Sequence, residues 1–131
     1  PNVRPYHTII PCMATKDNKL WLSFGVMGGF QQPQGHLQVI SNMVDYNLDP
    51  QDALDALRFS LDVKAMETIY VEEDLDKKII SDLVNKGHKI ETVSGNERIM
   101  FGGGQICQIN SETGVISVGT EPRKDGSALA F

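Results

Sequence analysis

Two adjacent glycines, Gly28 and Gly29, have the clearest chemical potential in this sequence. They follow an apolar, β-prone segment at 20–25, and Pro33 can open a helix shortly after them. Glycine has no Cβ, so the backbone can approach a ligand closely there. At a helix start, adjacent N–H groups can also point outward together, which suits an oxyanion. On the residues alone, a Gly-Gly pair after a strand more often forms only a turn.

The other polar motifs favour structural roles. The histidines are scattered without clustered carboxylates or thiols, so we expect no metal site; they are His7, His36 and His88. We expect His36 at the surface or as a capping residue, and His88 at a helix end. No Lys-Ser or Lys-Thr pair follows the glycines at 102–104, which favours a turn over a phosphate loop. We expect Arg123 and Asp125 to pair structurally.

Composition indicates an ordinary folded protein. The 131 residues are 40% hydrophobic and 22% charged, which predicts one domain spanning 1–131. Seventeen acidic and twelve basic side chains give a formal charge of -5, so we expect no nucleic-acid partner. The apolar runs are too short to span a membrane, and the start has no signal-peptide pattern.

The two cysteines, Cys12 and Cys107, lie far apart within apolar runs. Neither has the spacing of a CxxC motif, and two cysteines do not make a disulfide framework. We expect both to be buried thiols. Unpaired thiols slightly favour the cytoplasm.

Periodicity predicts the elements that must position the glycines. A hairpin is expected from segments 8–15 and 20–25, with Pro11 at a strand edge or bulge. A helix should follow from Pro33 and end at Asn47. Asp49 should cap a second helix that begins at Pro50.

The second half of the chain predicts a strand at 64–71 and a helix capped by Asp74 and ended by Gly87. A strand near Ile90 and a loose segment at 94–104 should follow. The chain should close with a hairpin of 105–109 and 115–119. Because strands and helices come in blocks, we expect the α+β class.

Four stretches resemble, in order and spacing, successive landmarks of the γ-glutamyltransferase small subunit. That family has an Arg-Pro-hydrophobic-Ser-Ser segment, a Gly-Gly turn, a Pro-Gln-Glu-Ala-like helix start and a terminal Pro-Arg-basic-Asp-Gly. The corresponding stretches here are 4–8, 25–36, 49–53 and 120–127. They cover nearly the whole chain, which resembles the C-terminal part of that catalytic subunit.

The resemblance implies an N-terminal-nucleophile hydrolase with an αββα sandwich, to which this chain adds the later strands and helices. In that family a new N-terminal Thr attacks the γ-amide carbonyl of a glutamyl donor such as glutathione. The acyl group then passes to water or to an amino acid, and no cofactor is implied. Carried over by position, Gly28 and Gly29 supply oxyanion N–H groups. His7 and Thr8 stand where the family has the serine pair that holds the α-carboxylate.

This sequence departs from the family pattern at two positions. His7 replaces a small hydroxyl with an imidazole that is mostly neutral at pH 7, since its reference pKa is about 6.5. The acyl group therefore differs, or its carboxylate is met by other means. Pro1 has no hydroxyl and cannot be the nucleophile. We expect the Thr, the rest of the small subunit and the large subunit upstream of this chain.

Three interpretations follow from the residues and the resemblance. The first is part of an enzyme that transfers or hydrolyses γ-glutamyl amides, with a γ-glutamyl small molecule as substrate. The second is a non-catalytic fragment without the nucleophile, and the third is a related acylase with another substrate. Because the sandwich is incomplete, we also expect the chain to self-associate through an open sheet edge or face.

Overall fold

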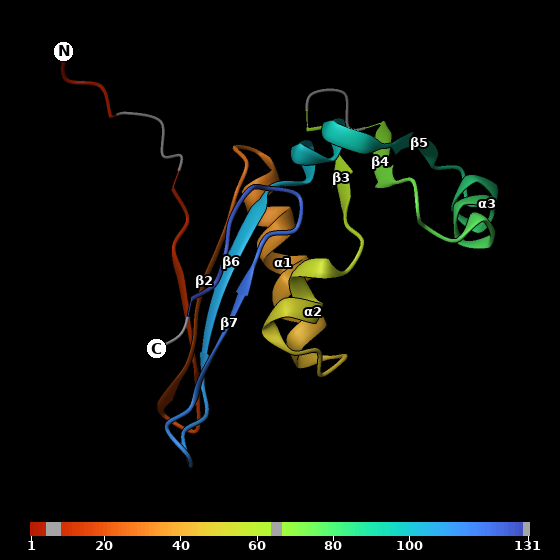
Figure 1. The fold of residues 1–131 in the computed structure, drawn as a ribbon. Helices are drawn as coiled ribbons and strands as arrows, with labels where there is room; N and C mark the ends of the chain where they lie inside the picture. The colour runs from red at the N-terminus through yellow and green to blue at the C-terminus, as the bar shows by residue number, and fades with distance from the viewer. Residues whose placement is uncertain (5–8, 64–66, 130–131) are drawn as a thin grey trace.

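The computed structural model describes residues 1–4, 9–63 and 67–129. Its larger sheet has four antiparallel strands in the order β1-β2-β6-β7. The strands are β1 (Cys12–Lys16), β2 (Lys19–Met27), β6 (Gly103–Ile109) and β7 (Ile116–Thr120). The β2-β6 pair joins two hairpins that lie far apart in the sequence (Figure 1).

Two helices, α1 (Gln31–Val44) and α2 (Pro50–Asp55), cover one face of this sheet (Figure 1). Alternate strand residues point toward them, as the two-residue period of a strand requires. The buried core consists of Leu22, Phe24, Val26, Val39, Met43, Ala53, Leu54 and Ile106. A Cβ at Gly119 would lie 2.5 Å from the carbonyl oxygen of Pro50, so glycine lets α2 rest on β7.

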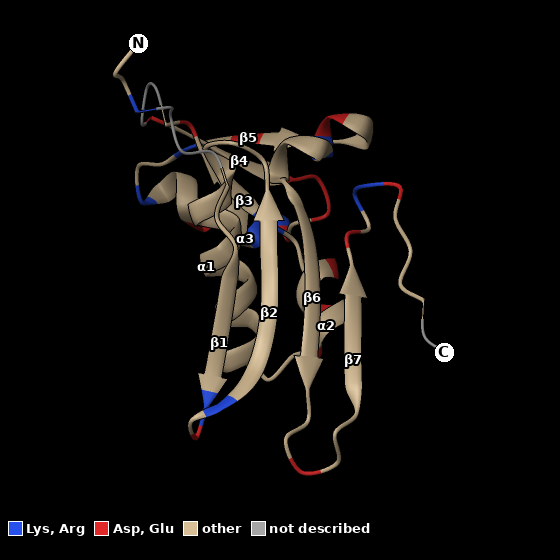
Figure 2. Ribbon diagram, turned by 90° about the vertical axis from the view of Figure 1, so that its left-hand side faces the viewer, with Lys and Arg blue, Asp and Glu red and all other residues tan. Residues whose placement is uncertain are grey.

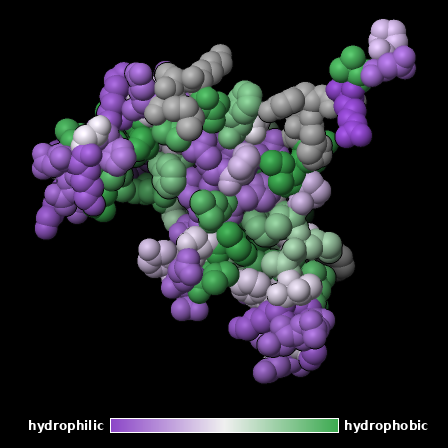
Figure 3. All heavy atoms as spheres, turned by 180° about the vertical axis from the view of Figure 1, so that it is seen from behind, coloured by the Kyte–Doolittle hydropathy of each residue, from purple (hydrophilic) through white to green (hydrophobic). Residues whose placement is uncertain are grey.

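A smaller sheet has the order β3-β4-β5, with β3 antiparallel and β5 parallel to β4. Its strands are β3 (Phe59–Leu61), β4 (Thr68–Glu72) and β5 (Lys89–Val93), and α3 (Lys77–Asn85) connects the parallel pair. The 3-10 helix η1 (Gly95–Phe101) leads back into β6. Figure 3, seen from behind, shows hydrophilic atoms over the projecting α3 and over the hairpin ends, with hydrophilic and hydrophobic atoms mixed between them.

The other face of the four-stranded sheet has no helix over it in the described chain. Met13, Ser23, Cys107 and Val118 form one cross-strand row on this open face. Figure 2 shows that the middle of these strands carries no charged residues. Cys107 is exposed here and Cys12 is partly buried, so the expectation of two buried thiols was wrong for Cys107.

The α+β class and both hairpins are confirmed, while several boundaries differ. Helix α1 begins at Gln31, two residues before Pro33, and ends at Val44 rather than Asn47. Asp76, not Asp74, caps α3, because its side chain accepts from the N–H of Lys78. The segment expected to be loose contains η1, and β3 was not expected at all.

Among residues 1–4, 9–63 and 67–129, no helix is long and apolar enough to cross a bilayer. The same residues contain no group of three or more His, Cys, Asp or Glu side chains placed to hold a metal ion.

Candidate functional site

The glycine turn connects the end of β2 to the start of α1. Gly28 has φ 141° and Gly29 has φ 59°, and both are exposed. Their carbonyl oxygens accept hydrogen bonds from the N–H groups of Gln31 and Gln32, at 3.0 and 3.1 Å. These bonds wind the chain directly into the helix, and they require backbone dihedrals that side chains rarely adopt.

The N–H groups of Gly28 and Gly29 have no hydrogen-bond acceptor within the described part of the chain. The N-cap residue of the 14-residue helix α1, Phe30, makes no side-chain capping hydrogen bond. The partial positive charge of a helix N-terminus favours an anion at this position. The two N–H groups of the turn are therefore available to donate to an anion.

Glutamine side chains at helical spacing fasten α1 to β3. Gln34 accepts from the N–H of Leu61 at 2.7 Å and donates to its carbonyl at 3.3 Å. Gln38 bonds both backbone groups of Phe59 in the same way, at 2.9 and 3.0 Å. These amides occupy the outer hydrogen-bonding edge of β3 as a neighbouring strand would. The spacing of the glutamines is visible in the sequence, but their partners are not.

The segment before β1 is fastened to another side of α1. The N–H of Ile10 donates to Oε1 of Gln32 at 3.1 Å. His36 bonds the carbonyl of Gln32 through Nδ1 at 2.7 Å, and its ring lies 5.4 Å from that of Phe24. His36 thus packs partly buried on the β2 side of the helix, whereas a surface or capping position was expected. His7 and Thr8 lie outside the described residues.

Behind the glycine turn lies an ion cluster of five side chains that the sequence did not reveal. Its members are Arg58, Glu72, Arg98, Glu121 and Arg123. Arg58 pairs with Glu121 at 2.9 Å, while Arg123 pairs with both glutamates. Both glutamate side chains are fully buried. The expected pairing of Arg123 with Asp125 was wrong, because buried glutamates compete more effectively for a buried guanidinium than an exposed aspartate.

Burial and charge pairing act in opposite directions on the pKa values of the cluster. Burial alone would raise the pKa of Glu72, but hydrogen bonds from Arg123, the N–H of Arg58 and Arg98 hold that pKa below its usual range. Burial lowers the pKa of Arg58, and Glu121 only partly offsets this effect. For Arg123, burial is outweighed by Glu72 and Glu121, so its pKa is raised.

The ion cluster also supports the turn. Arg58 donates to the carbonyl of Phe101 at 3.2 Å, and Glu121 accepts from the N–H of Gly104 at 2.7 Å. These bonds fix the backbone on both sides of Gly102, whose Cα lies 3.1 Å from the position of a Cβ on Gly28. The glycines at 102–104 therefore form the tightly packed support of the Gly28-Gly29 turn.

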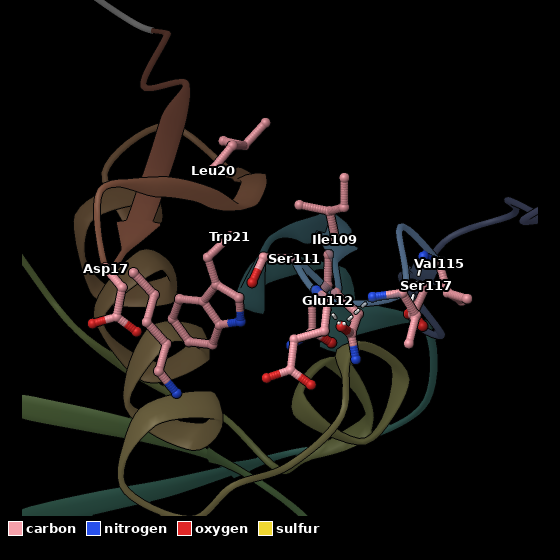
Figure 4. Close-up of a pocket in the computed structure, with 12 residues that line it drawn as sticks. Asp17, Leu20, Trp21, Ile109, Ser111, Glu112, Val115 and Ser117 are labelled. Atoms are coloured by element: carbon pink, nitrogen blue, oxygen red, sulfur yellow. Dashed lines mark hydrogen bonds between the residues drawn. The ribbon is translucent and has the colours of Figure 1, made fainter.

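A pocket of about 500 Å³ opens beside the turn. The two glycines form part of its wall, and polar and apolar side chains complete the rest: Phe30, Gln31, Gln34, Ser60, Leu61, Asp62, Val63, Tyr70 and Met100. A second hollow, of about 650 Å³, lies between the two hairpin ends around Trp21, Ile109 and Glu112 (Figure 4). It is at the opposite end of β2 from Gly28, so it is separate from the candidate site.

This α+β arrangement matches part of the solved gamma-glutamyltranspeptidases, which are N-terminal-nucleophile hydrolases. A Helicobacter pylori gamma-glutamyltranspeptidase mutant superimposes with a TM-score of 0.82 and 29% identity, covering 94% of this chain and 64% of that chain. The family model described as Gamma-glutamyltranspeptidase matches residues 1–131. The chain therefore belongs to the gamma-glutamyltranspeptidase family, as its motifs indicated.

Two further relatives show how much of the family's length the chain spans. It is 33% identical over 135 residues to the glutathione hydrolase-like YwrD proenzyme of Bacillus subtilis (strain 168), covering 100% of this chain and 25% of the relative. A cephalosporin acylase from Bacillus halodurans has 46% identity and a TM-score of 0.89, covering 96% of this chain and 23% of that chain. The chain thus spans about a quarter of each.

Proposed function

We propose that this chain is the C-terminal part of the small subunit of an enzyme that transfers or hydrolyses γ-glutamyl amides, within an αββα sandwich. Gly28 and Gly29 donate their N–H groups to the oxyanion of the tetrahedral intermediate, and His7 and Thr8 contribute to the acyl pocket. The nucleophilic Thr and the large subunit belong to the rest of the protein. The substrate is a γ-glutamyl small molecule, and no cofactor takes part.

The observation that carries this proposal is a glycine turn at a helix start, with two N–H groups that have no acceptor among the described residues, in a member of this family. Each attack on the amide carbonyl moves charge to its oxygen, and N–H donors fixed in advance stabilise that charge without reorganisation. The exposed position of both glycines leaves room for a carbonyl group to reach them.

The donor role can be tested in the complete protein with a chromogenic γ-glutamyl anilide. Proline at position 29 would delete one donor, but it needs φ near -65° where Gly29 has 59°. Replacing Gly29 with glycolate by semisynthesis exchanges the N–H for an ester oxygen and keeps the turn. We expect kcat to fall roughly 10²- to 10³-fold. An unchanged kcat in a correctly matured protein would refute the donor role.

A related acylase with another acyl group is the second candidate. Two observations favour it: His7 stands where the family has a serine, and the 46% identical structure is a cephalosporin acylase. Comparing kcat/KM of the complete protein for a γ-glutamyl anilide and for a glutaryl anilide, which lacks the α-amino and α-carboxylate groups, separates the two candidates. A preference for the glutaryl compound would establish the acylase interpretation.

A further inference from the structure

Helix α1 has a row of apolar side chains on the face that is turned away from the core. Val39 and Met43 pack into the core from this helix. Positions 33, 37, 40 and 44 are spaced by four, three and four residues, so they share a different face. Leu37 and Val44 on that face are 64% and 54% exposed. The row, named here the α1 seam, is exposed or partly buried throughout and consists of Pro33, Leu37, Ile40 and Val44.

The composition of α1 differs from that of a helix that faces water. The helix contains no Asp, Glu, Lys or Arg over its 14 residues. Of the polar side chains beside the seam, Gln34 and Gln38 bind the backbone of β3, and Ser41 donates to Asp45. A surface helix normally carries charged residues opposite its buried face, whereas the centres of protein interfaces are depleted of them. The composition therefore indicates that another element covers the seam.

Helix α3 provides the contrast within the same structure. Its residue Val84 is 51% exposed, close to the value for Val44 in the seam. However, α3 also carries Lys77, Lys78 and Asp82, and it projects away from the large sheet (Figure 1). Single exposed apolar residues among charged ones are ordinary at a protein surface. We therefore expect α3 to remain in water, where it can serve as the control for α1.

The spacing of the seam fits a second helix. A four-three-four repeat is the pattern by which side chains of two packed helices interlock, whereas a strand presents side chains at every second residue. Between positions 33 and 44 the seam rises roughly 16 Å, which is about three helical turns. A lipid surface fits less well, because helices that lie on membranes carry Lys and Arg on their polar face. Helix α1 has neither residue type.

The length of the family's proteins indicates where such a helix comes from. The chain spans 25% of one relative and 23% of another, so most of the length of these relatives lies outside the part that it matches. A second copy of the chain is a poor occupant, because a stable dimer buries roughly 800 Å² on each partner, far more than one row of four side chains offers. A helix of the same protein needs less surface, since other contacts already hold it nearby.

We propose that the α1 seam is covered by an α-helix from the part of the protein outside residues 1–131, which has apolar side chains at the matching spacing of three and four residues. Helix α1 then packs on the four-stranded sheet with one face and joins this chain to the rest of the protein with the other. This contact goes beyond the proposed function, because it does not depend on which amide the protein cleaves.

A matched pair of charged variants in the complete protein tests whether the seam is covered. We expect Val44→Asp to lower the denaturant midpoint of unfolding, because a carboxylate under a packed helix loses its hydration. Val84→Asp should leave the midpoint unchanged, as substitutions at an exposed surface usually do. Both valines lie at the C-terminal end of their helices, so the helix dipole acts similarly on the two carboxylates. Equal midpoints for the two variants would overturn the proposal.

Photo-cross-linking of the complete protein identifies the occupant. Replacing Ser41 with p-benzoylphenylalanine places the probe beside the seam and leaves its four side chains intact. We expect cross-links to a segment outside residues 1–131 whose apolar residues recur at intervals of three and four. Mixing with nitrogen-15-labelled protein detects links between copies. Such links, or links only within residues 1–131, would contradict the proposed occupant. Neither measurement requires turnover, so both outcomes are independent of the γ-glutamyl assignment.

Discussion

Gly28 and Gly29 differ in the strain and the steric contact that a Cβ atom would introduce. Gly28 has φ 141°, a region nearly restricted to glycine, and its Cβ would lie 3.1 Å from the Cα of Gly102. Gly29 has φ 59°, which other residues adopt at a cost of roughly 1–2 kcal/mol, and no atom of the described residues lies within 4 Å of its Cβ position. Gly29 should therefore tolerate substitution by alanine better than Gly28 does.

We expect Gly28→Ala to lower kcat for a γ-glutamyl anilide by roughly 10²-fold or more, because the turn must shift and misplace its donors. Gly29→Ala keeps its N–H and its space, so its kcat should fall by much less, about tenfold at most. Kinetics on the matured complete protein measure both effects. Equal losses in the two variants would show that the turn does not position donors in the way described.

Glu72 provides the second prediction at the residue scale. Its pKa is lower in the folded protein than in the unfolded chain, so the ionised form contributes stability at every pH above the ordinary glutamate value, about 4.3. That contribution is lost as the pH falls through the lower, folded-state pKa. We expect Glu72→Gln to destabilise the complete protein by about 3 kcal/mol at pH 7, because it leaves buried arginines without a counter-charge.

Denaturant unfolding between pH 3 and 7 measures this effect. The difference in unfolding free energy between wild type and Glu72→Gln should become smaller toward pH 3. Glu91→Gln is the matched control, since Glu91 pairs with Lys89 on the surface, where the side chains are 48% and 64% exposed. Removing the charge of Glu91 should not measurably change the unfolding free energy. A pH-independent difference for Glu72→Gln would mean that packing, not charge, explains the loss.

The residues of the turn were predictable because all the information is local: a strand, two glycines and a helical repeat follow one another. The ion cluster was not predictable, because Glu72 and Arg123 are 51 residues apart and nothing near either one identifies its partner. The prediction that Arg123 pairs with Asp125 rested on their proximity in the sequence. In the fold, the guanidinium of Arg123 instead reaches two buried carboxylates.

At the scale of elements, contact between α2 and β7 depends on one glycine. A Cβ at Gly119 would lie 2.5 Å from the carbonyl oxygen of Pro50 and 3.0 Å from the nitrogen of Gln51. Backbone atoms at a helix start cannot rotate away as a side chain can. We expect Gly119→Ala to lower the unfolding free energy of the complete protein by about 1–3 kcal/mol, the usual cost of overpacking.

Gly25→Ala is the control for this prediction, because its Cβ would meet the carbonyl oxygen of Ile10 at 3.8 Å and Nε2 of His36 at 4.0 Å, which are both ordinary contacts. It also lies in a strand of the same sheet. Denaturant unfolding of both variants checks the difference. If Gly119→Ala is as stable as Gly25→Ala, α2 can move away from the sheet without penalty.

Elements with strong periodicity or distinctive caps were predicted well, and short or tertiary elements were not. Asp49 caps α2 as expected, with its side chain accepting from the N–H groups of Gln51 and Asp52 at 2.9 Å. Strand β3 has only three residues, and the glutamines of α1 hold its outer edge, so no local pattern could reveal it. For α3, Asp74 and Asp76 are equally good caps by composition, and only the structure shows which one accepts a bond.

At the scale of the whole molecule, the open face of the four-stranded sheet governs solution behaviour. Met13, Met27 and Ile116 are 68%, 59% and 65% exposed, and the strands around them carry no charge over their middle (Figure 2). The proposed sandwich would place a second sheet against this face. We expect the isolated chain to self-associate through it, because apolar surface of this kind rarely stays exposed in water.

Light scattering over a concentration series tests this expectation. Ile116→Lys, on the open face, should reduce the apparent mass. Leu37→Lys should not, because Leu37 is equally exposed, at 64%, but lies on α1, on the opposite side of the sheet. A monomer at every concentration, or equal effects of both variants, would show that the open face does not drive association.

The ion cluster also has a consequence for the order in which this region acquires its structure during synthesis. Arg58 and Glu72 emerge from the ribosome well before Glu121 and Arg123, and one bond of the cluster, from Arg123 to the carbonyl of Leu54, spans 69 residues. Contacts between such distant residues carry a large loop-closure entropy, so they form late. Until Arg123 arrives, the carboxylate of Glu72 lacks one of its counter-charges. The support of the Gly28-Gly29 turn is therefore completed only when the last strand of the sheet and the residues after it have been made.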